Sequence, residues 1–325
     1  MDLNLFREIL EKDSTSGKER AMAEWLATRL EAPSVQKMEV GDGTLNLLFS
    51  WGTPKVVFCT HMDTVPPFIP PVFLEDRILG RGSCDAKGQI LAMYSACKRL
   101  EAEGLEGFGL LLLAGEETGS HGAKAFAKTG FRAPYLIVGE PTENKMVSAC
   151  KGTQSFSLTF GGEAFHSGYP QFGRSAVDMF VKFCNALRDK RFPEDPILGS
   201  TTWNVGKLIS DNPQNVLSPE LSCRLYFRTT FASHDEVRSY MELPWEHVSV
   251  GFFGGDTPAK YFTIDGFPSA PVSFGSDAPH LTNFTNRAIC GPGTVRVAHR
   301  DNEYILLRDL EEAVDMYVKM FKAIC

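Results

Sequence analysis

The order of apolar and polar residues predicts strands alternating with helices over the first half of the chain. Short apolar runs bounded by turn residues cover 45–49, 56–59, 110–114 and 136–138. Between the second and third runs, residues 88–103 place apolar side chains at helical spacing until Gly104 ends the pattern. Strands separated by helices favour a largely parallel sheet that is covered by helices, which is an α/β fold.

A further helix is predicted from about Lys18 to Glu31. Ser16 and Glu19 have the spacing of a capping box, in which the serine caps the helix and the glutamate reaches back. Apolar residues at helical spacing follow through residue 30. We therefore expect the first helix of the chain to begin here.

The pattern changes at Lys151, where an α+β insert is predicted. Residues 154–160 and 222–230 alternate like two-faced strands, and 175–187 and 233–241 have helical spacing. The earlier apolar pattern resumes near Pro271, and residues 307–324 form a final amphipathic helix. We expect one discontinuous domain, residues 1–150 and 255–325, interrupted by a second domain at 151–254.

Composition and charge narrow the classes of protein. The 325 residues carry a net charge of −7 with no basic cluster, which argues against nucleic acid as a partner. The strongly apolar run 110–114 is far shorter than a bilayer span, and the N-terminus lacks the pattern of a signal peptide. Eight single cysteines without a CxxC pair are typical of a reducing compartment. We expect a soluble cytoplasmic protein that has no membrane partner.

Acidic residues and a histidine follow the predicted strands at their carboxyl ends, where open α/β sheets bind ligands. Taken singly they have ordinary explanations, such as a helix N-cap for Asp85 and a solvated turn for Glu116 and Glu117. Gathered at one sheet edge, however, these carboxylates would repel one another unless they shared a cation. The residues concerned are His61, Asp63, Asp85, Glu116, Glu117 and Glu140.

Five short motifs resemble, in order and spacing, those of the M20 family of two-zinc peptidases and deacylases. They are Thr60-His-Met-Asp-Thr-Val-Pro66, Gly80-Arg-Gly-Ser-Cys-Asp-Ala-Lys-Gly88, Gly115-Glu-Glu-Thr-Gly-Ser120, Val138-Gly-Glu-Pro-Thr142 and Ala298-His-Arg-Asp-Asn-Glu303. The resemblance covers both ends of the chain. It implies a zinc-exopeptidase-like catalytic domain interrupted by a ferredoxin-like lid or dimerisation domain.

The resemblance also implies a ligand set for two Zn²⁺ ions, with Co²⁺ or Mn²⁺ as alternatives. His61 and Glu140 would hold one ion, Glu117 and His299 the other, and Asp85 would bridge both. Imidazole and carboxylate are ordinary Zn²⁺ ligands. The peptide bond between Asp85 and the following alanine would be cis.

Other roles follow from the same resemblance. Asp63 would orient the imidazole of His61, and Glu116 would be the general base. In the insert, His166 would stabilise the oxyanion of a neighbouring subunit's substrate, within a homodimer formed by the lid domain. Asn215 and Arg228 would bind the carboxylate of the substrate.

For the reaction, the resemblance favours removal of an N-acyl group from an amino acid such as N-acetylornithine, a step of amino-acid and arginine biosynthesis. In the family, deacylases and carboxypeptidases carry Glu at the position of Glu140, whereas members that act on a peptide with a free α-amino group often carry Asp there. The loop Gly275-Ser-Asp-Ala-Pro-His280 is closer to acetylornithine and acetyl-lysine deacetylases than to desuccinylases. A carboxypeptidase or dipeptidase and a succinyl-diaminopimelate desuccinylase stay open, as does an inactive dimeric scaffold.

Overall fold

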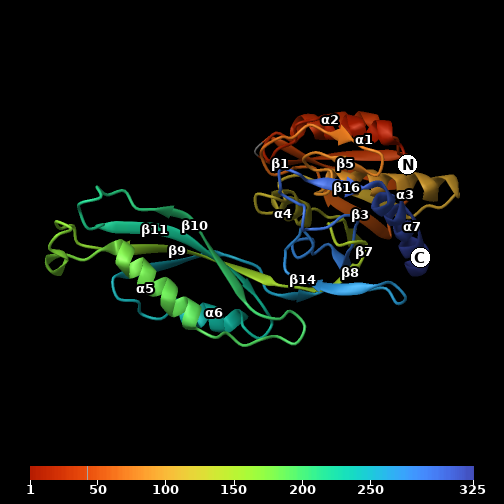
Figure 1. Cartoon of the computed structure of the whole chain (residues 1–325). Helices are drawn as coiled ribbons and strands as arrows, with labels where there is room; N and C mark the ends of the chain where they lie inside the picture. The colour runs from red at the N-terminus through yellow and green to blue at the C-terminus, as the bar shows by residue number, and fades with distance from the viewer. Residues whose placement is uncertain (42) are drawn as a thin grey trace. The chain divides into compact units, whose positions relative to one another are not determined.

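The chain divides into two compact units in a computed structural model that describes residues 1–41 and 43–325 (Figure 1). Unit 1 contains residues 1–148, 261–270 and 276–325, and unit 2 contains 149–260 and 271–275. Residues 149–150, 255–260 and 271–275, which the sequence pattern assigns to the surrounding domain, thus belong to unit 2. The reason is local pairing, because β13 (Ala259–Lys260) bonds to the end of β8 (Met146–Cys150).

Unit 1 is built on a six-stranded sheet in the order β1-β2-β6-β3-β7-β15. The pairs β6–β3, β3–β7 and β7–β15 are parallel, whereas β1 and β2 add an antiparallel hairpin at one edge. The prediction of a largely parallel sheet is confirmed. The strands are β1 (Ser34–Gly41), β2 (Thr44–Trp51), β3 (Val56–His61), β6 (Phe108–Leu113), β7 (Ala133–Val138) and β15 (Phe284–Ile289).

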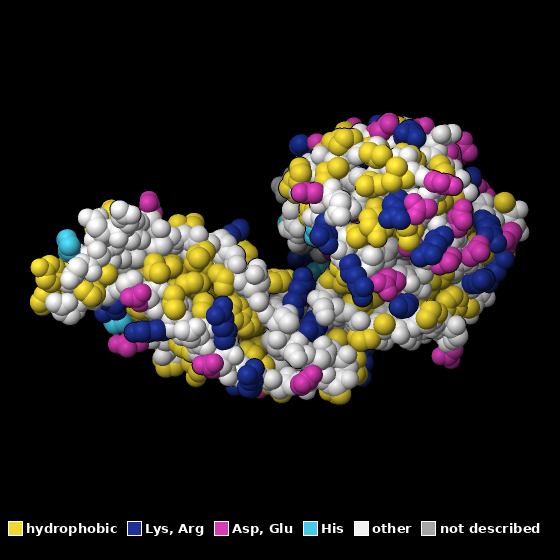
Figure 2. All heavy atoms as spheres, in the orientation of Figure 1, with side chains coloured by type: hydrophobic (Ala, Val, Ile, Leu, Met, Phe, Trp, Pro, Cys, Tyr) yellow, Lys and Arg dark blue, Asp and Glu magenta, His cyan; other side chains and the backbone are white. Residues whose placement is uncertain are grey.

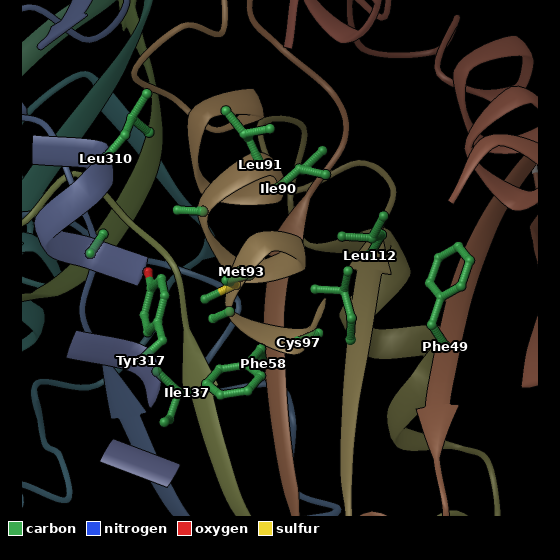
Figure 3. Packing of buried hydrophobic residues seen from close by; sticks show 14 of the residues in the cluster. Phe49, Phe58, Ile90, Leu91, Met93, Cys97, Leu112, Ile137, Leu310 and Tyr317 are labelled. Carbon is green, nitrogen blue, oxygen red and sulfur yellow. The ribbon is translucent and has the colours of Figure 1, made fainter. Parts of the chain in front are cut away.

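Helices cover the sheet, so that its central strands β3 and β6 are buried along their whole length. One core joins alternate strand residues, such as Phe58 and Leu112, to side chains of α1 (Leu3–Leu10), α2 (Arg20–Arg29), α3 (Lys87–Ala102) and α7 (Leu307–Ile324). Figure 3 shows part of this core, with Tyr317 of α7 beside α3. The intervening residue Val57 is equally buried and faces the opposite side. A fifth helix, α4 (His121–Ala127), contacts β1 and β2.

The start of the chain differs from the prediction in two ways. A helix, α1, precedes the expected first one, capped by the carboxylate of Asp2. The capping box at Ser16 and Glu19 is absent, because the Ser16 hydroxyl instead donates to Asp63 at 2.9 Å. The Glu19 carboxylate accepts from the backbone N–H of Gly17. Helix α2 therefore begins at Arg20 without a side-chain cap.

Unit 2 has the βαββαβ order and the strand order β12-β9-β11-β10 of a ferredoxin-like fold, and all neighbouring strands are antiparallel. Two helices pack on one face of the sheet over an aromatic core that includes Phe156 and Phe160. The elements are β9 (Gly152–Gly161), α5 (Ala176–Asp189), β10 (Thr202–Ile209), β11 (Glu220–Thr229), α6 (His234–Met241) and β12 (Val248–Gly254).

Short strands and turns complete the fold. In unit 1, β5 (Arg77–Leu79) pairs with β4 (Val72–Phe73) and with β16 (Tyr304–Leu306). The remaining elements are β14 (Ser269–Val272) and a 3₁₀ turn at Pro170–Phe172. Among the described residues, no helix combines the length and apolar character that crossing a membrane would require.

The core of unit 2 generates a stability prediction. Phe160 is fully buried, with ring centroids 5.6 Å from both Phe180 and Phe183. Phe160→Ala should lower the free energy of unfolding by about 3–5 kcal/mol, because it removes these contacts and leaves a cavity. Ile197→Ala, at an exposed position, should change it by less than about 0.5 kcal/mol. Urea unfolding followed by tryptophan fluorescence measures both, and equal effects would contradict the packing described.

Candidate metal centre

The acids and histidines of the predicted site meet because β3, β6 and β7 run parallel and side by side. His61 is the last residue of β3 and is level with the last residue of β6. Glu140 follows β7 by two residues, at the same level as His61. The turn after β6 carries Glu116 and Glu117. The register of the sheet thus collects these side chains at one edge.

Asp85 lies between two histidines. Its Oδ1 is 3.1 Å from Nε2 of His61, and its Oδ2 is 3.3 Å from Nε2 of His299. Nε2 of His299 is also 2.9 Å from Oε1 of Glu117. One ligand atom each from His61, Asp85 and Glu117 lies within 4.8 Å of the others. Each oxygen of Asp85 therefore faces a different histidine, as a carboxylate that bridges two ions would.

The carboxylate of Asp85 belongs to this cluster and does not cap the following helix. The N-cap residue of α3 is Ala86, which makes no side-chain capping bond. The peptide bond between Asp85 and Ala86 is cis, as the family resemblance implies.

Glu140, which is buried, and Glu116, which is half-buried, complete the cluster of acids. Glu140 is 4% exposed, and its Oε1 is buried without a hydrogen-bond partner among the described residues. Burial, reinforced by the charges of Glu116 and Asp85, raises the pKa of Glu140 well above its usual range. Burial also raises the pKa of Glu116 well above its usual range, although His61 opposes this shift. The charged form of both carboxylates is thus disfavoured, and the imidazole of His61 offsets only part of this effect.

Asp63 holds both the histidine and the acidic turn. Its carboxylate accepts the backbone N–H groups of Glu116 at 3.0 Å and Glu117 at 3.2 Å. Nδ1 of His61 lies 2.9 Å from the carbonyl oxygen of Asp63. Burial acts to lower the pKa of His61, but its hydrogen bonds to Asp63 and Asp85 outweigh burial and raise it. Asp63 therefore orients the imidazole so that Nε2 points to Asp85.

The donor set fits two divalent cations. Imidazole nitrogen with carboxylate oxygen suits Zn²⁺, Mn²⁺ and Co²⁺. The partnerless oxygen of Glu140 and the shared carboxylate of Asp85 are groups that such cations would satisfy. The ligands that the resemblance implies form a chain of contacts from His61 through Asp85 and His299 to Glu117, and Glu140 is close enough for its pKa to respond to Asp85.

The residues expected to act from the insert fall into two groups within unit 2. His166 is exposed, and the backbone N–H of Ser167 donates to the carbonyl of Asn215 at 2.9 Å, so the two loops lie together. Arg228 lies near the far end of β11, which begins at Glu220 after the Asn215 loop. Eight strand residues span about 26 Å. One small substrate thus cannot contact His166 and Arg228 of the same unit 2.

Three residues at the site were not singled out from the sequence. Asp277 is 3% exposed, and burial raises its pKa to about 6. Arg81 and Glu303 form a buried ion pair at 2.7 Å, next to Asp85. All three lie inside segments that the sequence analysis singles out, namely 80–88, 275–280 and 298–303. Membership of these segments could have drawn attention to them. Their contacts, however, join segments too distant in sequence for local spacing to reveal.

Comparison with known proteins places this geometry in a family. The profile of peptidase family M20/M25/M40 matches residues 57–323. A probable carboxypeptidase of Aspergillus oryzae is 32% identical over 375 residues, covering 99% of this chain and 87% of the relative.

Two solved structures share the fold. A tripeptidase from Staphylococcus aureus superposes with a TM-score of 0.78 at 20% identity, covering 98% of this chain and 96% of that one. An M20 family metallo-carboxypeptidase from Sulfolobus solfataricus gives 0.74 at 16% identity, covering 99% of each. Because the family profile spans most of the chain and the Aspergillus relative matches nearly all of it, this protein belongs to peptidase family M20/M25/M40, a family of metal-dependent hydrolases of amide bonds.

Proposed function

We propose that this protein is a metal-dependent carboxypeptidase that releases the C-terminal amino acid from a short or N-blocked peptide. The observation that carries the proposal is the arrangement around Asp85, whose two oxygens face His61 and His299 separately. This is the arrangement expected of a carboxylate shared by two cations. The A. oryzae relative, named a probable carboxypeptidase, supports the choice of substrate class.

In this proposal His61 and Glu140 hold one ion, Glu117 and His299 hold the other, and Asp85 contacts both. Bound divalent ions would polarise the scissile carbonyl and lower the pKa of water. Zn²⁺ is the ion we expect, with Co²⁺ and Mn²⁺ as alternatives that the same donors accept.

Glu116 is the proposed general base. It neighbours Glu117 in a turn whose two N–H groups are held by Asp63, so its carboxylate is presented beside the ligands. It would take a proton from the attacking water and return it to the leaving amine. Asp63 would act by keeping His61 and this turn in place.

We propose carboxypeptidase activity in place of the N-acetylornithine deacetylation that the sequence motifs favour. Glu140 fits both classes, so only the loop 275–280 favoured the deacetylase. Part of this loop makes contacts within the fold, since Arg287 donates to the carbonyls of Ala278 and Pro279, both at 3.0 Å. Asp277 is itself buried. Such a loop is a weak guide to substrate.

Arg228 is the proposed anchor for the carboxylate of the substrate. It is partly buried on β11, and its charge adds to burial in lowering the pKa of Lys151, a nearby lysine of the same unit. Two neighbouring cations leave a local excess of positive charge, which a bound carboxylate would offset. A substrate with a free C-terminus meets this requirement, whether it is a peptide or an N-acyl amino acid.

A homodimer formed through unit 2 would bring His166 and Asn215 of one copy to a substrate held by Arg228 of the other. Because the loops of His166 and Asn215 lie at the Glu220 end of β11, about 26 Å from Arg228 along the strand, one substrate could meet all three only if they came from two copies. The edge strand β10 is the proposed contact. Exposed apolar side chains accompany it, namely Leu208, Ile209 and, on α5, Val177 and Val181. Figure 2 shows apolar side chains gathered over α5.

The opposite edge of this sheet is less suited to pairing. Both edge strands have a register shift, β10 between Gly206 and Ile209 and β12 between Phe252 and Gly254, so bulges do not distinguish the two edges. The guanidinium of Arg238 lies 3.8 Å from the ring of Phe252, and that of Arg224 lies 3.8 Å from Phe253. Charged groups over a strand are a usual protection of a sheet edge, and here they lie over β12.

A hollow of about 430 Å³ beside β10, lined by residues such as Phe180 and Trp203, would receive side chains of the second copy.

The inactive-scaffold alternative fits these observations less well. A scaffold needs neither a buried, partnerless carboxylate such as Glu140 nor a base beside the ligands. Both cost free energy on folding. Their retention favours catalysis.

Glu116→Gln tests the proposed base. It should leave metal content unchanged and lower kcat by about 10²–10⁴-fold, because only the proton acceptor is lost. Asp85→Ala should instead lose both ions, and Glu106→Gln at an exposed turn should change neither property. Elemental analysis and steady-state kinetics on N-blocked dipeptides measure these effects. A Glu116→Gln enzyme with near wild-type kcat would remove Glu116 from the mechanism.

Substrate choice is tested with matched pairs of N-blocked dipeptides that end in a free carboxylate or in an amide. The free acid should be preferred by at least roughly 30-fold in kcat/KM, since an unpaired charge costs about 2–5 kcal/mol. Arg228→Ala should erase this preference, whereas Arg191→Ala, at an exposed site, should retain it. Faster cleavage of N-acetylornithine than of every peptide tested would restore the deacetylase.

Subunit mixing tests the dimer. Glu116→Gln and His166→Ala proteins should each be nearly inactive, and a mixture should regain activity because a hybrid dimer contains one site with both groups. Mixing two samples of the same variant is the control. If labelled subunits exchange and activity does not return, His166 acts on the site of its own chain and the proposed dimer arrangement is wrong.

A further inference from the structure

Glu303 is buried directly behind Asp85. Its side chain is 1% exposed, and its Oε1 accepts the backbone N–H groups of Cys84 and Asp85, each at 3.0 Å. Its Oε2 accepts from Nη1 of Arg81 at 2.7 Å. One carboxylate thus fixes two successive amides of the loop that carries Asp85.

Arg81 connects Glu303 to the loop that carries His299. It is also 1% exposed, and its Nη1 donates to the carbonyl oxygen of Arg300 at 3.1 Å, the residue after His299. Its Nε lies 3.3 Å from the carbonyl oxygen of Pro67, to which it donates. The pair therefore joins the loop of Asp85 to the loop of His299, across 222 positions of sequence.

Stability alone is a poor explanation for this pair. Removing two charges from water costs several kcal/mol, and apolar residues of similar volume often stabilise a protein as well or better. Exposed pairs, such as Arg29 with Glu8, carry no such cost. The partners that Glu303 and Arg81 satisfy are the backbones of Asp85 and of the residue next to His299, which are the two sides of the proposed metal bridge.

We propose that Glu303, held in place by Arg81, is a positioning residue that sets the direction of the Asp85 carboxylate toward both ions and holds His299 opposite it. This inference rests on the metal centre of the proposed function. Glu303 touches no ligand atom; it acts through the backbone of Asp85. Groups of this kind typically change metal affinity by about 10–100-fold when they are lost.

Glu303→Gln is the principal test. The amide retains the volume of the carboxylate but places an NH₂ donor against either Arg81 or the two backbone N–H groups, so one contact must break. We expect the affinity of the purified protein for Zn²⁺, measured by competition with a chromophoric chelator, to fall about 10–100-fold. The visible spectrum of the Co²⁺-loaded protein should also change.

Leu26→Ala is the matched control, because Leu26 is fully buried in α2 and lies outside both loops. It should lower the Tm of the metal-free protein while leaving Zn²⁺ affinity and the Co²⁺ spectrum unchanged. A purely structural role for Glu303 predicts that both variants lose affinity only in proportion to lost stability, and that result would overturn the proposal. Wild-type affinity and an unchanged spectrum in Glu303→Gln would also overturn it.

If Glu303→Gln does not fold, Arg81→Lys decides the question. Lysine keeps the charge opposite Glu303 but cannot donate to Arg300 and Pro67 from a planar fork. Weaker Zn²⁺ binding with a retained Tm supports the proposal, and unchanged binding overturns it. Absence of metal uptake by the unaltered protein would contradict the proposed function itself, an outcome distinct from an effect confined to these variants.

Discussion

The constraint on which this structure depends is the repulsion among acids that a parallel sheet register brings to one edge. His61, Glu117 and Glu140 lie at or just beyond the ends of three neighbouring strands, and Asp85 lies in the loop before α3. In a buried setting such carboxylates either take up protons or share a cation. Two observations reflect this repulsion: the pKa of Glu140 is raised, and Asp85 contacts a histidine with each of its oxygens. Divalent ions would resolve it by offsetting several negative charges at once.

The surrounding fold is organised to hold these groups in place. Asp63 fixes the acidic turn and His61, while Glu303 fixes the backbone of Asp85. Ser16 donates to Asp63, so the segment before α2 supports the site as well. Both ends of the chain therefore serve one small region of unit 1. Unit 2 has its own aromatic core and presents separate polar groups, including His166 and Arg228.

The sequence predicts the central strands and long helices well, because a continuous apolar run such as 110–113 has few alternatives to a buried strand. Acids immediately after such runs could be placed at one edge from the rule for parallel sheets. The capping box failed because Ser16 finds a partner 47 residues away, which local spacing cannot show. The helix at Leu3–Leu10 could have been predicted from Asp2, a favourable N-cap residue, and from the apolar residues Phe6 and Leu10 at helical spacing. The contact between Arg81 and Glu303 could be identified only from the folded structure, because the two residues are 222 positions apart in sequence.

The discontinuity of unit 1 has a consequence for the order of events during synthesis. A ribosome completes His61, Asp85, Glu117 and Glu140 before it makes unit 2, whereas β15, His299 and Glu303 emerge only afterwards. Until then the sheet lacks an outer strand, and Asp85 lacks both its second histidine and its backbone acceptor. The nascent chain therefore cannot assemble a complete site, and hydrolytic competence arises only after the C-terminal segment joins the sheet.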